Sequence, residues 1–334
     1  MCMKLDLNAQ GAAASADTSS LELQYRRTKF HRFLIRSRRN WQLHMLVFLP
    51  LLYLCIWDFY PLYGQQIAFR EFKPRAGIWA SEWVGIKHII DFWNAPNFLV
   101  LLKNTVFLAS YQLAIGFPVP IILALFLHIC PSRRYAKLVQ NTAYIPHFIS
   151  TVVLVGLMDQ MLNPVSGLYG TIYELMGGVG YATDIRSMPG SFRHMYVWSG
   201  VWQNMGWSTI IYCAALAGVS QELHEAAELD GATRLARVFH VDLPAILPTI
   251  CILLIMRFAG IMSVGHAKVY LMQNDLNLST SEVISTYVYK TGIGQMRLSF
   301  GTAVGMWNSL IHTVLLLIVN KITNWLSDGE NGLF

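Results

Sequence analysis

The residues whose types and spacing suggest chemistry lie between positions 221 and 248, and that chemistry is recognition of another protein. Four charged side chains surround three alanines there: Glu225, Glu228, Arg234 and Arg237 around Ala226, Ala227 and Ala232. Alanine leaves little side chain beyond the backbone, so a partner's backbone can approach closely. The charges around the alanines can then fix the partner's orientation.

Local sequence predicts the shape of this segment as two short helices joined by a tight turn. Ser220 is a suitable N-cap for a helix over 221–229, because its hydroxyl accepts a bond from an otherwise unpaired amide. Asp230 and Gly231 then end that helix, since glycine adopts the left-handed backbone of a sharp stop. Thr233 caps a second helix, which we expect to end at about residue 241, before Pro244. A plain loop turn is the simpler interpretation of the Asp-Gly pair alone.

Motifs for catalysis are missing from the sequence. It contains no GxxxxGK[ST] phosphate loop and no HExxH, GxSxG or DxDxDG pattern. The ten histidines show no metal-ligand spacing, so we predict neither a catalytic residue nor a metal site. This chain therefore cannot build the phosphate cradle of a P-loop ATPase by itself.

A second group of residues has the chemistry of sugar binding. Its members are indole rings and amides in two apolar segments: Trp202, Gln203, Asn204, Trp207, Trp307 and Asn308. Sugar rings stack on indole faces, and sugar hydroxyls bond to amides. We predict that these residues line a translocation path; membrane-interface anchoring and helix packing are the alternative roles.

Ionisable residues inside membrane segments are functional candidates. Asp58, Lys103, Asp159 and Lys268 fall near the ends of predicted spans, where access to the interface explains them. Arg257 falls near the middle of a predicted span. It is predicted to face the path or a partner subunit, with a stabilising contact between helices as an equal alternative.

Composition requires that these residues be carried by membrane-spanning helices. The 334 residues are 54% hydrophobic and only 13% charged, with a mean hydropathy of +0.41. Soluble domains carry about 25% charged residues, so we predict an all-α membrane protein. Its six predicted spans are residues 41–60, 98–129, 139–162, 195–218, 247–270 and 300–322. Pro118 and Pro120 predict a kink or tilt in the second.

The connecting segments define the predicted domain organisation. Residues 1–40 form a cytoplasmic tail with a basic amphipathic segment, 41–322 the six-span domain with its helical turn at 220–244, and 323–334 a cytoplasmic tail. Residues 163–193 are predicted as an external loop with a short helix, and 273–297 as a polar external loop. With both termini inside, 14 Lys and Arg lie on the inner side and 8 on the outer, so the positive-inside rule places the turn in the cytosol. The net charge of +6 therefore reflects topology and not nucleic-acid binding.

The stretch EAAELDGA, followed by a Phe, an Asp and the Leu-Pro pair at 243–244, resembles the EAA signature of ABC importer permeases. From about residue 41 to 334 the chain is similar to the complex-carbohydrate branch of that family, through NTVFLASYQLAIGFPVPIILALFL, YIPHFIS and STYVYKTGIG. It departs from the pattern at His224 and His240. Residues 1–40 have no counterpart in the family.

This resemblance implies a type I permease fold in a bacterial inner membrane, with the helical turn as the coupling helix that docks on an ATPase. The coupling residues it implies are Glu225, Ala226, Ala227, Glu228, Asp230, Gly231, Ala232 and Pro244. It also implies a second and different homologous permease, two ATP-binding subunits that use ATP and Mg²⁺, an extracytoplasmic binding protein and an oligosaccharide cargo. No cofactor is expected on this chain. The alternatives are a secondary transporter or channel without an ATPase, a membrane-anchored scaffold and, last, a membrane enzyme.

Overall fold

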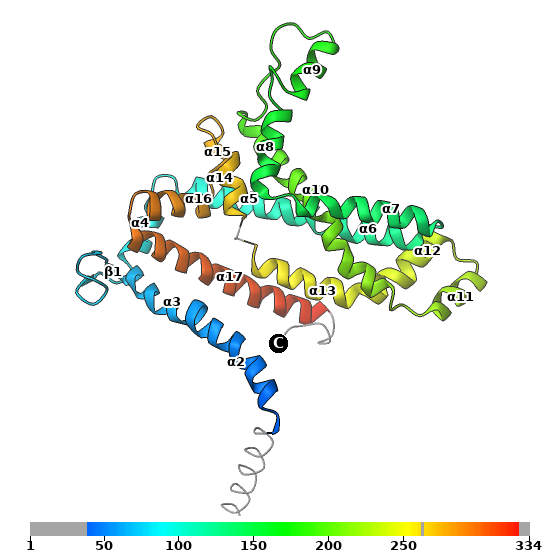
Figure 1. Cartoon of the computed structure of the whole chain (residues 1–334), viewed down its shortest axis with the longest axis horizontal. Helices are drawn as coiled ribbons and strands as arrows, with labels where there is room; N and C mark the ends of the chain where they lie inside the picture. The colour runs from blue at the N-terminus through cyan, green and yellow to red at the C-terminus, as the bar shows by residue number, and fades with distance from the viewer. Residues whose placement is uncertain (1–38, 262–263, 327–334) are drawn as a thin grey trace, which may run out of the picture. The chain divides into compact units, whose positions relative to one another are not determined.

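The computed structural model describes residues 39–261 and 264–326, so nearly all of the two predicted tails, and with them the basic segment, lies outside the described residues. The chain divides into two units, residues 1–66 and 67–334. Almost every described element is a helix (Figure 1).

The described part of the first unit is one helical run. It begins at Trp41, as predicted, with α2 (Trp41–Leu54), and it passes through a π turn η1 (Cys55–Phe59) and α3 (Tyr60–Leu62). A 3₁₀ segment η2 (Tyr63–Phe69) leads into the second unit. No residue of α2 is buried, and its outward apolar side chains suit contact with lipid.

The second unit opens with a short hairpin and continues as helices. Strands β1 (Arg70–Glu71) and β2 (Glu82–Trp83) pair antiparallel, with Arg70 opposite Trp83. The helices up to the helical turn are α4 (Lys87–Trp93), α5 (Phe98–Gly116), α6 (Pro118–Ile129), α7 (Arg133–Tyr144), η3 (Ile145–Phe148), α8 (Thr151–Met161), α9 (Leu168–Leu175) and α10 (Pro189–Leu216). The short helix predicted within residues 163–193 is α9.

The remaining helices follow the helical turn. They are α11 (Gln221–Leu229), α12 (Arg234–Arg237), η4 (Val238–Asp242), α13 (Leu243–Ala259), α14 (His266–Met272), α15 (Leu278–Ser281), α16 (Ile284–Val288), η5 (Tyr289–Gly294) and α17 (Leu298–Leu326). α13 runs beside α17 and α10, and α10 packs on α6 and α5 (Figure 1).

Proline and serine break two of the predicted spans. The predicted second span divides at Phe117 into α5 and α6, and α6 begins at Pro118. The predicted third span, 139–162, is not one straight helix, because α7–η3 and α8 meet at a bend of 98°. Pro146 cannot donate to a helical ladder, and the Ser150 hydroxyl caps α8 by accepting from the Val153 amide at 3.3 Å.

Four described helices are long and apolar enough to cross a membrane, namely Trp41–Phe69, Phe98–Ile129, Arg234–Phe258 and Leu298–Lys321, and the bent pair makes a fifth candidate. α10 is 28 residues long but is not among them. Polar residues in its middle, such as Gln203 and Asn204, lower its hydropathy. The count of six spans therefore stays a prediction.

The end of the predicted fifth span and the polar loop after it are both corrected by the structure. α13 ends at Ala259, and residues 266–272 form a separate helix, α14. The predicted loop 273–297 folds into α15, α16 and η5, and it buries Asn277, Ser281 and Thr286 completely. These polar groups bond within the segment, since the Ser281 hydroxyl donates to Asn277 Oδ1 at 2.7 Å.

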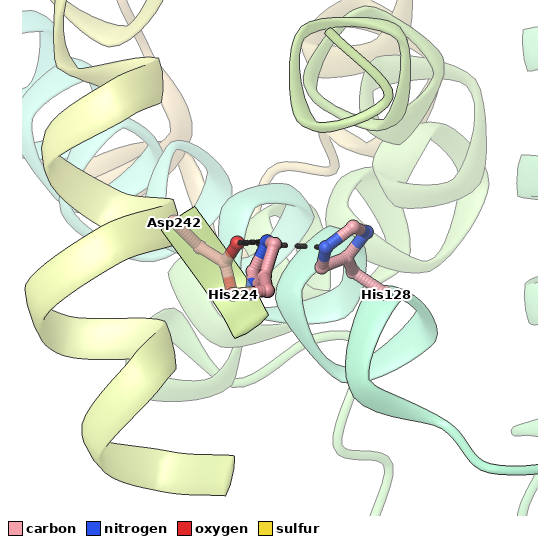
Figure 2. A group of neighbouring side chains, drawn as sticks. All are labelled: His128, His224 and Asp242. Atoms are coloured by element: carbon pink, nitrogen blue, oxygen red, sulfur yellow. Dashed lines mark ion pairs between the residues drawn. The ribbon is translucent and has the colours of Figure 1, made fainter. Parts of the chain in front are cut away.

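One apolar cluster joins α6, α10 and α13. Its buried members are Ile121, Ala124, Tyr212, Leu216 and Ile246. Near it, the end of α6 meets α11 and η4, where His128, His224 and Asp242 converge (Figure 2).

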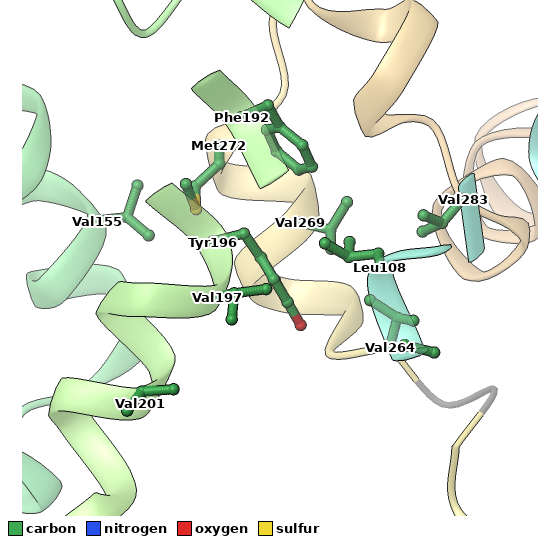
Figure 3. Packing of buried hydrophobic residues seen from close by; sticks show 11 residues of the cluster. Leu108, Val155, Phe192, Tyr196, Val197, Val201, Val264, Val269, Met272 and Val283 are labelled. Atoms are coloured by element: carbon green, nitrogen blue, oxygen red, sulfur yellow. The ribbon is translucent and has the colours of Figure 1, made fainter. Parts of the chain in front are cut away.

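A second cluster joins α5, α8, α10 and α14 with the segments around Val264 and Val283. It is centred on Leu108, Phe192, Tyr196, Val197 and Val269 (Figure 3). Lys268 of α14 is also buried there, because its ammonium donates to the Tyr196 carbonyl at 3.0 Å and lies over the Tyr196 ring. The prediction that Lys268 sits at an accessible span end is therefore wrong.

Candidate functional site

The helical turn begins as local sequence predicts. α11 spans Gln221–Leu229, and the Ser220 hydroxyl accepts from the Glu222 amide at 3.3 Å. Gly231 ends it at φ +78°, with its amide bonded to the Glu228 carbonyl and the Ala232 amide bonded to the Ala227 carbonyl at 2.9 Å. These bonds form a Schellman cap, which holds the turn by backbone geometry alone.

The second arm of the turn differs from the prediction. Thr233 caps α12, as expected, by accepting from the Ala236 amide at 3.3 Å. The helix then continues through Pro244 into α13, so the prediction that it ends before this proline is wrong. The π turn η4, which ends at Asp242, is the physical reason. Its wider backbone leaves space for the proline ring, and the helix needs no amide hydrogen from residue 244 there.

The surface of the turn is open. Six of its eight predicted coupling residues are exposed, namely Glu225, Ala226, Glu228, Asp230, Gly231 and Pro244, while Ala227 and Ala232 are half-buried. Glu228 accepts from Arg237 at 3.0 Å and so joins the two arms.

Apolar side chains are also exposed on the turn, and the sequence analysis did not identify them. They are Leu223, Leu229, Leu235 and Phe239, and Leu229 is 90% exposed. Such a group beside a charged patch is typical of a surface that another protein covers. The helical periodicity of these leucines gives no sign that they face outward.

Part of the predicted path group gathers around one cavity. This cavity has a volume of about 310 Å³ and lies between α5, Phe117, α10 and the end of α13. Its polar lining consists of Gln112, Asn204, Trp207, Ser208 and Arg257. A second cavity of about 450 Å³ shares Trp207, Ser208 and Arg257 with the first. The structure therefore brings together three residues that the sequence analysis selected from two separate segments: Asn204 and Trp207 from one, and Arg257 from the other.

Arg257 is the cation of this cavity. It lies in the last turn of α13, so its predicted place near the middle of a span is wrong, because the helix ends at Ala259. Its side chain is exposed, and no carboxylate within residues 39–261 and 264–326 pairs with it. A cation in such a place is available to a bound anion.

His147 contacts two residues that line this cavity, Trp207 and Asn204, and was missed by the sequence analysis. Its ring stacks on Trp207 with centroids 4.6 Å apart, and its Nδ1 lies 3.2 Å from Asn204 Oδ1. Because His147 belongs to η3 and its partners to α10, no local spacing indicates the contact. The stack fixes one face of Trp207 and orients the Asn204 amide.

The other predicted path residues lie elsewhere. Gln203 is buried and donates to the Ile149 carbonyl at 2.7 Å, so its amide is already engaged. Trp202 is 45% exposed but does not line the cavity. Trp307 packs edge-on against Phe92, and Asn308 lines a separate cavity with His266.

Comparison with known proteins identifies the family. Residues 85–328 match the family described as "Binding-protein-dependent transport system inner membrane component". The chain is 37% identical over 310 residues to the polygalacturonan/rhamnogalacturonan transport system permease protein YteP of Bacillus subtilis (strain 168), covering 93% of this chain and 95% of YteP.

Two solved structures are also similar to this chain. One is a bacterial alginate ABC transporter in complex with alginate pentasaccharide-bound periplasmic protein, with a TM-score of 0.80, 31% identity and coverage of 89% of this chain and 98% of that one. The other is a bacterial ABC transporter involved in the import of the acidic polysaccharide alginate, with a TM-score of 0.80, 32% identity and coverage of 88% and 98%. The chain therefore belongs to the binding-protein-dependent transport system inner membrane components and has the type I permease fold of ABC importers.

Proposed function

We propose that this chain is the transmembrane subunit of an ATP-driven importer of acidic oligosaccharides. The observation that carries this proposal is the cavity lined by Arg257, a cation that forms no ion pair with the described residues. The family and the names of the relatives support it, since YteP and the alginate transporter are named for acidic polysaccharides.

The cavity has the chemistry that an acidic sugar needs. Trp207 offers an indole face to a sugar ring, and the Asn204 and Gln112 amides can bond to hydroxyls. The Arg257 guanidinium is planar and always charged, so it can bind a uronate carboxylate in a bidentate geometry. A charged hydrogen bond of this kind contributes about 1.5–3 kcal/mol, or roughly 10- to 150-fold in affinity.

Energy comes from partner chains in this proposal. The sequence has no phosphate loop, so two separate ATP-binding subunits supply ATP hydrolysis with Mg²⁺, and this chain is not an enzyme. The open turn, with Glu225 and Leu229 exposed, docks on an ATPase and transmits its closure to α13 through the helix that runs on past Pro244. The path then alternates between inward- and outward-facing states.

The remaining partners and the location follow from the same proposal. A second, different permease completes the path, and an extracytoplasmic binding protein delivers the cargo. The chain crosses a bacterial inner membrane several times with both termini in the cytoplasm, an orientation that the distribution of Lys and Arg supports.

The experiment that tests the cargo compares Arg257→Gln and Arg257→Lys with wild type in the complete complex in proteoliposomes. The cargoes are oligogalacturonate and its carboxyl-reduced, neutral analogue. We expect Arg257→Gln to raise the KM for oligogalacturonate at least about 10-fold and to leave uptake of the neutral analogue unchanged, with partial recovery in Arg257→Lys. Arg133→Gln, at an exposed arginine of α7, is the control. Wild-type uptake by Arg257→Gln would refute the role of Arg257.

A further inference from the structure

Three ligand-type side chains converge where α6, α11 and η4 meet. His128 lies in the last turn of α6, His224 in the middle of α11, and Asp242 at the end of η4 (Figure 2). Sequence spacing gives no sign of this group, because its members come from three separate helices. The cavity lined by Arg257 does not include any of them.

The carboxylate at the centre of the group is buried, and one of its oxygens accepts no hydrogen bond from the described residues. Asp242 is 1% exposed, and its Oδ1 accepts no hydrogen bond from the described residues. His224 Nε2 is likewise buried without one. A buried carboxylate oxygen that accepts no hydrogen bond is costly unless a positive charge lies beside it, and the side chains beside this oxygen are the imidazoles of His128 and His224.

The spacing of the three atoms fits a metal ion. Asp242 Oδ1 lies 3.2 Å from His224 Nε2 and 3.4 Å from His128 Nε2. In a tetrahedral zinc site, with bonds of about 2.0–2.1 Å, two ligand atoms lie about 3.3 Å apart. The ligand atoms of the two histidines lie within 4.8 Å of each other, and the side chain of His128 is 32% exposed.

We propose that His128, His224 and Asp242 form a binding site for a divalent transition-metal ion of the Zn²⁺ class. Two imidazole nitrogens and one carboxylate oxygen are ligands that Zn²⁺ prefers, and three protein ligands leave the fourth position to water. The ion supplies the positive charge that the buried Asp242 requires.

The location of the site gives the ion a structural effect. Because His224 belongs to α11, which has no buried residue of its own, the ion ties this helix to α6 and to the start of α13. If the turn couples to an ATPase as proposed above, metal occupancy stiffens the coupling element. Metal binding itself does not depend on that role, so its test is independent of transport.

The test measures zinc binding by the intact complex in nanodiscs after removal of metal with a chelator. ZnCl₂ is titrated against a chromophoric competitor, and bound zinc is counted by mass spectrometry. We expect one more zinc per copy of this chain in wild type than in His128→Ala or His224→Ala, with affinity reduced at least about 100-fold in both variants. His240→Ala, at an exposed histidine of η4, is the matched control and should keep the ion.

Cobalt gives a second measurement, the visible absorption of the bound ion. Histidines with a purely structural role would not produce this absorption. We expect Co²⁺ to produce the visible absorption of a tetrahedral site in wild type and in His240→Ala, and not in His224→Ala. Both alanine variants change partly accessible side chains and leave the buried Asp242 in place, so the fold should be preserved. Equal zinc content in wild type and both variants, or no zinc bound by wild type at about 10 μM free metal, would overturn the proposal and leave an ion-pair network only.

Discussion

Gly231 is a residue at which the helical turn is sensitive to an added side chain. Its φ is +78°, and a Cβ built there meets no atom within 4 Å. A substitution therefore adds backbone strain and no steric clash, so the effect depends on the residue's tolerance of the left-handed region. We expect an order of Asn, then Ala, then Val, from mildest to most severe.

The magnitude follows from the left-handed backbone. An ordinary L-residue in this region costs about 1–2 kcal/mol, which is roughly 5- to 30-fold in the population of the native turn. α11 buries no residue, so little packing holds the turn against this strain. We predict that cargo-stimulated ATPase activity falls at least about 5-fold in Gly231→Val, falls less in Gly231→Ala, and stays near wild type in Gly231→Asn.

The assay is ATP hydrolysis by the reconstituted complex, with and without loaded binding protein, alongside the amount of complex recovered from the membrane. The recovered amount should be equal in all three variants, because no buried contact is lost. Equal stimulation in wild type and Gly231→Val would refute the reasoning. A loss in Gly231→Asn as large as that in Gly231→Val would mean that the partner requires the absence of a side chain at position 231, and that the left-handed backbone is not the cause.

Further predictions concern packing and pairing in the second unit. Gly206→Val should abolish folded protein, since a Cβ at Gly206 would lie 2.1 Å from the Ala143 carbonyl oxygen; a normal yield on size-exclusion chromatography would contradict this contact. Asn104→Leu should cost about 2–5 kcal/mol, since the buried amide donates to two backbone carbonyls at and just after α15; an unchanged thermal midpoint in detergent would contradict it. Glu228→Gln breaks the exposed pair with Arg237 and should cost under about 1 kcal/mol, so a fall in thermal midpoint beyond roughly 4 °C would show that the pair matters more than its exposure implies.

Local rules predicted the parts of the structure that local bonds determine. Ser220 and Gly231 set the ends of α11 through bonds within a few residues, so sequence alone gave the helix bounds correctly. The same rules failed at Pro244, because a π turn just before it removes the usual reason for a helix to end. Residues 273–297 were predicted as a loop from their polarity. The segment nevertheless folds into short helices, because the buried Ser281 hydroxyl donates a hydrogen bond to the buried Asn277 side chain.

Residues that depend on tertiary contacts were predicted less completely. Asn204 and Trp207 were selected for their chemistry, but their meeting with Arg257 depends on how α10 packs against α13. His147 and the group at His128 and His224 were missed, since neither pattern repeats at a helical or metal-ligand spacing in the chain. Residue types therefore predict which side chains can take part in a site, whereas the contacts between those side chains depend on the fold.

The measurement that tests the central claim most directly is uptake of labelled oligogalacturonate by proteoliposomes that hold this chain, its partner permease, the ATP-binding subunits and the binding protein. The account predicts uptake that requires internal ATP and external binding protein and continues without any ion gradient. Uptake driven by a proton or sodium gradient, with no need for the ATP-binding subunits, would contradict it and support a secondary transporter.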